Sequence, residues 1–295
     1  MSLALPSPDL VLAALVAGLT NGAVYALVAL GLTLVYGVLH IVNFAHGSLL
    51  MLALYAAYFL HRLAGLDPYW ALLVLPPAFF VLGYALQRAV IMPASRGRDE
   101  NILLVTLGLA IIIDNLALAL WTSTTRTIDV PYAFEVLDLG VALVPVPKAV
   151  AFAAALAAAG LLWLLVARTD LGRAIRAVAK ERQGARVVGI DVEHIYAVSF
   201  GIGASTVAVA ACLLLPSFYV SPQVGHAFVL VAFTTVVLGG MGSFEGALLG
   251  GLALGMVEAL GGVLLGESLG QIGIFAVFIL VLMFRPTGLF GSRAA

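Results

Sequence analysis

Charged residues are scarce in this 295-residue chain, which has 10% Asp, Glu, Lys and Arg against 63% hydrophobic residues. Soluble domains average about 25% charged residues, so this chain cannot cover a surface that faces water. Its net charge of −1 provides no electrostatic basis for binding nucleic acid. The single cysteine, Cys212, cannot form an internal disulfide and is expected to be a small packed residue.

Motifs for ATP hydrolysis and for metal binding are also absent. The phosphate-binding pattern G-x-x-x-x-G-K-[ST] contains a lysine. The only two lysines, Lys148 and Lys180, do not lie in such a pattern. The five histidines show no metal-ligand spacing, and the pattern H-E-x-x-H does not occur. We therefore expect no catalytic, cofactor-binding or metal-binding residue, and we expect that the chain is not an enzyme.

Long apolar runs are abundant, and the mean hydropathy is +1.15. A membrane helix needs about 20 mostly apolar residues. The candidate spans are residues 10–38, 45–61, 69–91, 102–121, 148–167, 195–216, 225–240, 244–265 and 268–284. We predict an all-α integral membrane protein, a helical bundle of eight or nine transmembrane spans with interrupted helices. A single transmembrane domain is expected to cover residues 1–295.

The positions of the basic residues predict the orientation of the bundle. Most of the 14 Lys and Arg residues lie in residues 88–98, 168–186 and 285–293, and the other loops hold only Arg62, Arg126 and Lys148. Loops rich in Lys and Arg stay in the cytoplasm. Nine spans then place the N-terminus outside and the C-terminus inside.

Residues 168–194 form the longest of these basic loops, and residues 169–182 are predicted to be a short amphipathic helix. Asp170 lies where it favours a helix N-terminus. Apolar and basic residues fall on separate faces: Leu171, Ile175 and Val178 on one, and Arg173, Arg176 and Lys180 on the other. Two explanations fit: a basic helix lying on anionic lipid headgroups, or a coupling helix that fits a groove in a separate ATPase subunit.

The longest outward loop, residues 122–147, contains Thr, Ser, three prolines and the acids Asp129, Glu135 and Asp138. It is either a platform for an extracytoplasmic partner or a solvated connector.

Two polar, glycine-containing breaks, residues 36–48 and 238–246, separate the apolar runs. Non-helical backbone persists at membrane depth only where protein or a wet cavity surrounds it, and interrupted helices are typical of solute pathways. Asn43 is placed to cap the helix that follows. Close helix packing is the alternative explanation for the glycines at 250, 251 and 255. The candidate solute-pathway residues are Tyr25, Tyr36, Asn43, His46, Ser48, Asp114, Gly239, Gly240 and Ser243.

Asp114 is the most deeply placed charge, within Ile111–Asn115, and Glu245 and Glu258 lie in or near spans. A charge at the centre of a bilayer costs about 2.5–3.5 kcal/mol on insertion scales, so such residues are functional candidates. For Glu245 and Glu258, a position near the membrane interface is the alternative.

Three blocks of sequence, in order, resemble the LivH-type permeases of branched-chain amino acid ABC importers, and the resemblance covers nearly the whole chain. The matching segments are residues 18–27, 31–37 and 43–47; residues 172–185 and 189–190; and residues 237–243, 246–247 and 258–260.

The resemblance implies a heteromeric importer in a bacterial or archaeal cytoplasmic membrane. Its other parts would be a second, LivM-like permease, two ABC ATPase subunits that bind ATP and Mg, and an extracytoplasmic solute-binding protein. Residues 168–194 would then be the ATPase-coupling segment, with Arg173, Arg176, Glu181, Ala185 and Gly189 as its coupling residues.

One residue departs from the family pattern: LivH-type sequences commonly have a lysine shortly before the Ala-Phe of the seventh span, where this chain has Val231 before Ala232 and Phe233. Importers of urea, amides or other small polar solutes are therefore an alternative. A self-sufficient secondary transporter that uses Asp114 as a proton site is a further one.

Overall fold

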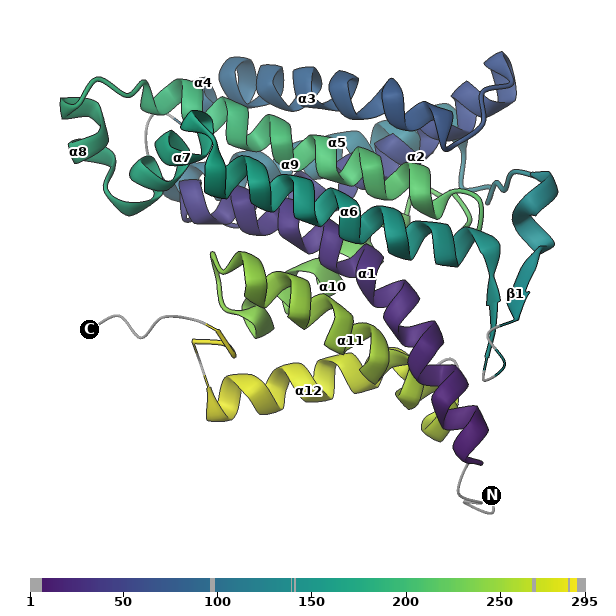
Figure 1. Cartoon of the computed structure of the whole chain (residues 1–295). Coiled ribbons are helices and arrows are strands. Elements are labelled where there is room, and N and C mark those ends of the chain that lie inside the picture. The colour runs from purple at the N-terminus through teal and green to yellow at the C-terminus, as the bar shows by residue number, and fades with distance from the viewer. Residues whose placement is uncertain are drawn as a thin grey trace.

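The computed structural model describes residues 7–95, 99–138, 140, 142–266, 269–285 and 287–290, and it is a bundle of long helices (Figure 1). Within these residues, seven helices are long and apolar enough to cross a membrane. They are α1 (Pro8–Leu39), α2 (Ala45–Ala64), the third span at Leu75–Ser95, α5 (Asp99–Trp121), α6 (Val146–Arg168), α9 (Val192–Leu214) and α11 (Phe244–Leu265). Two shorter apolar helices are α10 (Val224–Gly239) and α12 (Gly270–Phe284). The predicted all-α membrane bundle is confirmed.

The third span is one continuous helix with a π-helical turn at Gln87–Ile91, which joins α3 (Leu75–Leu86) to α4 (Met92–Ser95). The predicted start at residue 69 is wrong, since Trp70–Leu73 forms a separate 3₁₀ turn. Proline in the first turn of α3 explains the new start, since proline lacks the N–H that a helix interior requires but the first turn does not.

The outward loop contains secondary structure that the sequence analysis did not predict. A 3₁₀ turn at Pro131–Phe134 is followed by β1 (Val136–Asp138) and β2 (Leu143–Pro145). The strands pair antiparallel, with Val136 opposite Pro145 and Asp138 opposite Leu143. This small hairpin leads directly into α6.

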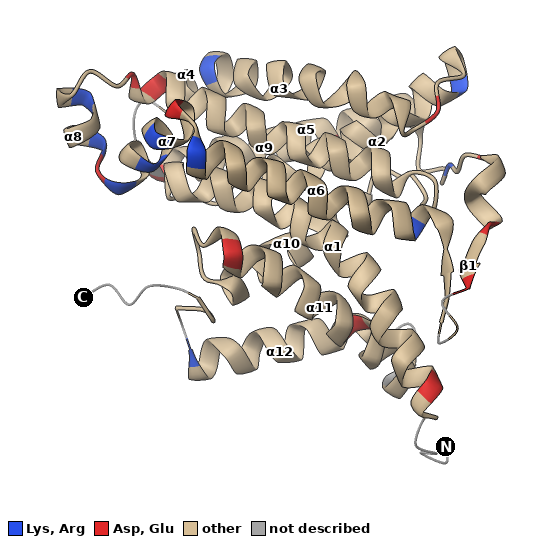
Figure 2. Cartoon of the chain, viewed as in Figure 1, with Lys and Arg blue, Asp and Glu red and all other residues tan. Residues whose placement is uncertain are grey.

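The two ends of the bundle differ in their elements and their charges. The short helices α7 (Asp170–Lys180) and α8 (Arg182–Val187) lie at the end where α12 finishes, whereas α1 begins at the end with the hairpin (Figure 1). Lys and Arg gather on α7 and α8 (Figure 2). We call these the α7–α8 end and the hairpin end. The positive-inside rule predicts that the α7–α8 end is cytoplasmic.

Small residues bring α1 and α11 into backbone contact. A Cβ added to Gly251 would lie 2.5 Å from Ala26 Cα, and one added to Gly255 would lie 2.4 Å from Gly22 Cα. Such contacts are typical of membrane helices, which pack closely where small residues meet. The packing explanation for Gly251 and Gly255 is therefore confirmed.

Burial separates central from peripheral helices. In α1 and α9, 83% of the most apolar 18-residue window is buried, against 22% in α5 and α6. The apolar outer faces of α5 and α6 are therefore left to lipid or to another protein chain.

Candidate functional site at the two ends of the bundle

Helix α7 is amphipathic in the structure, as predicted. Its N-cap, Thr169, accepts a hydrogen bond from Gly172 N at 3.0 Å through its hydroxyl. Ile175 and Val178 are buried, and Arg173 forms an exposed ion pair with Asp170. Gly172 is held tightly against α6, since an added Cβ would lie 2.1 Å from Val166 O. Helix α7 is thus fixed to the end of α6.

Helix α8 continues from α7 through a sharp turn. The Glu181 carboxylate accepts a hydrogen bond from Gln183 N at 3.0 Å and so caps α8, while Ala185 is buried. Gly189 has a φ of +85°, a conformation that L side chains rarely adopt. The apolar tip between them is exposed, with Val187 at 87% and Val188 at 74%. This exposed apolar tip on an otherwise charged segment is the candidate contact site at this end of the bundle.

Arg182, the first residue of α8, ties this pair to the core of the bundle. Its guanidinium donates to Leu39 O at 2.8 Å and lies 5.7 Å from the centroid of the Tyr196 ring. Leu39 is the last residue of α1 and Tyr196 lies in the first turns of α9. The sequence analysis treated Arg182 only as one member of a basic run, because its partner on α1 is 143 residues away.

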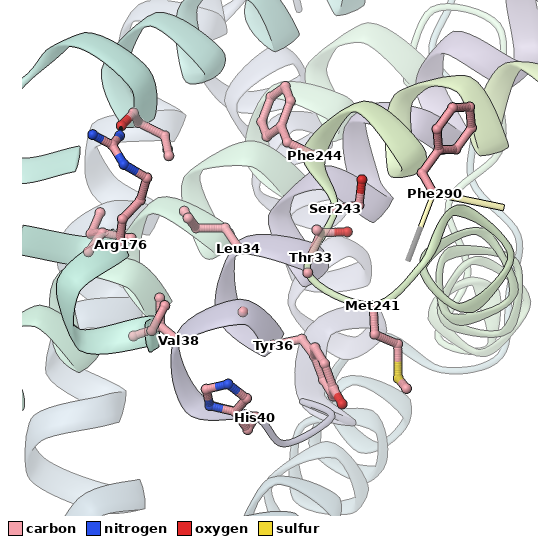
Figure 3. Close-up of a pocket in the computed structure, with 15 residues that line it drawn as sticks. Thr33, Leu34, Tyr36, Val38, His40, Arg176, Met241, Ser243, Phe244 and Phe290 are labelled. Carbon is pink, nitrogen blue, oxygen red and sulfur yellow. Dashed lines mark hydrogen bonds between the residues drawn. The ribbon is translucent and has the colours of Figure 1, made fainter. Parts of the chain in front are cut away.

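The two polar breaks lie together at the α7–α8 end. A cavity of about 330 Å³ is lined by residues of both breaks and of α7 (Figure 3). Its lining includes Tyr36 and His40 from the first break, Ser243 from the second, Arg176 from α7 and Phe290 from the C-terminal segment. A Cβ on Gly37 would lie 3.8 Å from Gly242 Cα, so the breaks approach closely.

Both breaks are turns between helices, and their depth in a membrane stays a prediction. The first break is the turn between α1 and α2, where His40 has a φ of 58° and Asn43 Oδ1 accepts from Ala45 N at 3.1 Å. Asn43 thus accepts from the first N–H of α2, but the N-cap position belongs to Phe44, so the predicted placement of the cap is off by one residue. Sequence hydropathy could not show that the polar stretch lies at the end of the bundle.

The second break is the turn between α10 and α11. Gly240 has a φ of 99°, Gly239 packs against Gly246, and the Ser243 hydroxyl caps α11 by accepting from Gly246 N at 3.1 Å. The C-terminal segment adds two bonds here, since Phe290 N donates to Gly239 O at 3.1 Å and Leu289 N donates to Leu238 O.

Other predicted pathway residues lie away from this cavity. His46 is fully buried, with Nε2 2.9 Å from Val28 O, and Ser48 is also buried. Asp114 Oδ2 lies 3.4 Å from His226 Nε2, a contact between α5 and α10. Tyr25 lines other cavities, nearer the hairpin end. The structure therefore gathers only Tyr36 and Ser243 of the predicted pathway set.

At the hairpin end, Arg126 holds the outward loop onto α2 and α5. Its guanidinium donates to Trp121 O at 2.9 Å and lies within 6.0 Å of the centroids of the Tyr55, Tyr58 and Phe59 rings. Its backbone pairs with Val220 in both directions. Sequence analysis noted only that Arg126 is an outside cation.

A second contact holds the loop near the start of the third span. The Tyr132 hydroxyl donates to Asp67 Oδ2 at 2.7 Å, and the Tyr132 ring stacks on Tyr69 at 5.2 Å. Burial, with the nearby Asp67 carboxylate, raises the pKa of Tyr69 to about 12. Burial and the bond to Asp67 raise the pKa of Tyr132 above its usual value.

A bundle of long apolar helices with a basic, amphipathic helix at one end defines a multi-spanning membrane protein. A family model described as "Branched-chain amino acid transport system / permease component" matches residues 14–284, and the chain belongs to this family.

Curated relatives match this chain along almost its full length. The chain is 35% identical over 290 residues to the high-affinity branched-chain amino acid transport system permease protein BraD of Pseudomonas aeruginosa, covering 94% of each. It is 32% identical over 293 residues to LivH of Escherichia coli, covering 93% of each. It is 28% identical over 282 residues to a probable LivH of Methanocaldococcus jannaschii, covering 90% of this chain and 88% of that protein. No solved structure gives a significant match.

Proposed function

We propose that this chain is a permease subunit of an ATP-driven importer for branched-chain or other hydrophobic amino acids, in the cytoplasmic membrane. The observation that carries the proposal is α7–α8, a short helix pair fixed to α1 and α6 with an exposed apolar tip, in a member of this permease family. A self-sufficient carrier has no use for such a segment. ATP and Mg are bound by separate ATPase subunits, and this chain performs no chemical step.

The helix pair α7–α8 is the lever in this proposal. The tip at Val187 and Val188 enters a groove in an ATPase subunit, with Arg173 and Arg186 available for rim contacts. A movement of the tip reaches α1 through Arg182, which holds Leu39 O, and reaches α6 through Gly172 and Arg176, which donates to Val166 O. The cavity at the α7–α8 end changes shape with these helices, since Arg176 and Tyr36 both line it.

The remaining subunits follow from the same proposal. A second, LivM-like permease covers the exposed faces of this bundle, and solute crosses between the two permeases. An extracytoplasmic solute-binding protein delivers the solute at the hairpin end. The departure from the LivH-type pattern at Val231 keeps urea and amides as competing solutes.

The first test is to purify the tagged chain from its native membrane in mild detergent and to identify the proteins that accompany it. The purified assembly, with its binding protein, is then placed in liposomes and offered labelled L-leucine with and without internal ATP. Recovery of an ATPase and a second permease, with uptake that needs ATP, supports the proposal. The chain recovered alone, with uptake that does not need ATP, would mean a secondary carrier and would move attention to Asp114. ATP-dependent uptake of urea but not leucine would correct the solute.

A further inference from the structure

Two neighbouring cavities lie between α1, α10, α11 and the start of α6, in the half of the bundle nearer the hairpin. One, of about 230 Å³, is lined by Tyr25 of α1, Glu258 of α11 and Gln271 of α12. The other, of about 130 Å³, is lined by Tyr25 again, with Lys148 and Asn21. One cavity thus carries a carboxyl group and the other an amine.

An aromatic wall separates the two cavities, since Tyr25, Phe218 and Phe228 line both. Phe228 meets Tyr25 edge to face at 5.9 Å and Phe218 at 5.5 Å. Only one of these residues, Phe228, belongs to α10, the short helix that ends at the second break. A small displacement of α10 would join the cavities into one chamber with apolar sides and opposite charges at its ends.

One carboxylate oxygen in this region lacks the partner that its burial requires. Glu258 Oε2 is buried without a hydrogen-bond partner. The Tyr25 hydroxyl lies beside the Glu258 carboxyl, and Lys148 is the cation whose field reaches it. Buried polar atoms are normally hydrogen-bonded, and ionisable groups inside membranes mark pathways for solutes. A ligand with a cationic end would satisfy Glu258, and one with an anionic end would satisfy Lys148.

We infer that this pair of cavities is a recognition site for a zwitterionic amino acid with an apolar side chain. The ammonium group of the solute binds Glu258 and Tyr25, and its carboxylate binds Lys148 and the amide of Asn21. The apolar side chain lies against Phe218 and Phe228. This assignment rests on the proposed function, and it deepens it by naming the groups that distinguish an amino acid from urea or a simple amide.

The direct test uses photo-leucine, a leucine analogue with a diazirine in its side chain, on the assembled importer in lipid nanodiscs. After illumination, mass spectrometry maps the labelled residues. We expect label on peptides containing Tyr25, Phe228 or Glu258. Excess L-leucine should suppress it, whereas 4-methylpentanoate and isopentylamine, which each lack one of the two charges, should not. Label found only elsewhere, or suppressed equally well by the singly charged analogues, would overturn the inference.

Substitutions provide the second test, in ATP-dependent uptake of L-leucine. Each charged contact is worth about a tenfold to hundredfold change, so Glu258→Gln and Lys148→Met should lower the maximal uptake rate by about that factor. The matched control is Glu245→Gln, the same change on an exposed residue of the same helix, which should leave uptake unchanged. Recovery of the ATPase with each variant shows that folding and assembly are intact.

The outcomes separate the inference from the proposed function. Wild-type importer that takes up no leucine with ATP overturns the proposed function and the site with it. Wild-type importer that takes up leucine, with Glu258→Gln and Lys148→Met equally active, overturns the site alone.

Discussion

The two ends of the bundle are held together by different kinds of contact. At the α7–α8 end, side chains bond to backbone groups at helix ends, as in Thr169 to Gly172 N, Glu181 to Gln183 N and Arg182 to Leu39 O. At the hairpin end, aromatic rings pack on one another and on one guanidinium. The Tyr55 ring stacks on the Trp121 ring at 4.1 Å, and the Arg126 guanidinium lies over the Tyr55 ring.

The contrast indicates different mechanical roles. Backbone bonds at helix ends fix the direction in which α7 and α8 point while leaving Val187 and Val188 exposed for a partner. The aromatic contacts at the hairpin end bury their own surfaces and hold the outward loop down. Changes at the α7–α8 end should therefore abolish coupling without loss of stability, and changes at the hairpin end should lower stability without loss of coupling.

The largest effect is expected for Glu181→Lys. A lysine cannot accept the bond from Gln183 N, and it places a cation at the N-terminus of α8, where the helix dipole is unfavourable to it. ATP-dependent uptake should fall to background, as it should after deletion of residues 173–182, while the protein still inserts in the membrane. The control is Glu193→Lys, in the first turn of α9 at the same end. Normal uptake by Glu181→Lys would contradict the lever.

A smaller loss is expected for Arg182→Ala, which removes the link between α8 and α1. Losing a charge-assisted hydrogen bond and a cation–π contact weakens the link by about 2–3 kcal/mol. Uptake should fall by about 30-fold to 150-fold while the associated ATPase continues to turn over, because the tip still binds but no longer moves α1. The control is Arg88→Ala, which also replaces an arginine by alanine but lies in the third span, and it should leave uptake unchanged. Equal losses of uptake and ATPase activity would indicate misassembly instead.

Features that depend on neighbouring residues could be predicted from the sequence. The nine apolar helices of the described residues, the amphipathic α7 and the bond that Asn43 accepts at the start of α2 follow from local hydropathy, side-chain period and the chemistry of helix ends. The first residues of α3 could not be placed, because Trp70–Leu73 is as apolar as a span although its backbone turns.

Long-range contacts carried no local signal. Arg182 and Leu39, Tyr25 and Glu258, and Tyr132 and Asp67 lie far apart in the chain, and only the packing of the helices brings them together. The polar breaks were visible as composition, but only the packing of the helices shows that the two turns lie next to each other. The nine predicted pathway residues consequently lie in several separate parts of the bundle and do not line one cavity.

At the hairpin end, Arg126→Ala should lower stability and leave coupling intact. It removes the bond to Trp121 O and the contact with three rings, a loss of about 1–2 kcal/mol. The Tm of the detergent-solubilised protein should fall by roughly 2–6 °C, and the ratio of uptake to ATPase activity should not change. Arg62→Ala, on an exposed residue at the same end, is the control. A changed ratio of uptake to ATPase activity with an unchanged Tm would contradict the roles assigned to the two ends.

The smallest effect is expected from Tyr132, and it should appear only in alkaline solution. The folded state raises the pKa of Tyr132 through burial and the bond to Asp67, so the unfolded chain loses this proton at lower pH than the folded protein does. The stabilisation is therefore fully present below about pH 10, the ordinary tyrosine value, and is lost as the pH rises further. The Tm measured from pH 8 to pH 11 should fall above pH 10, and it should fall less steeply in Tyr132→Phe. Tyr219→Phe, on a half-exposed tyrosine of the same end that lacks a carboxylate bond among the described contacts, should follow the wild-type curve. Parallel curves for wild type and Tyr132→Phe would mean that the Asp67 bond does not hold the outward loop, and Arg126 alone would then account for its attachment.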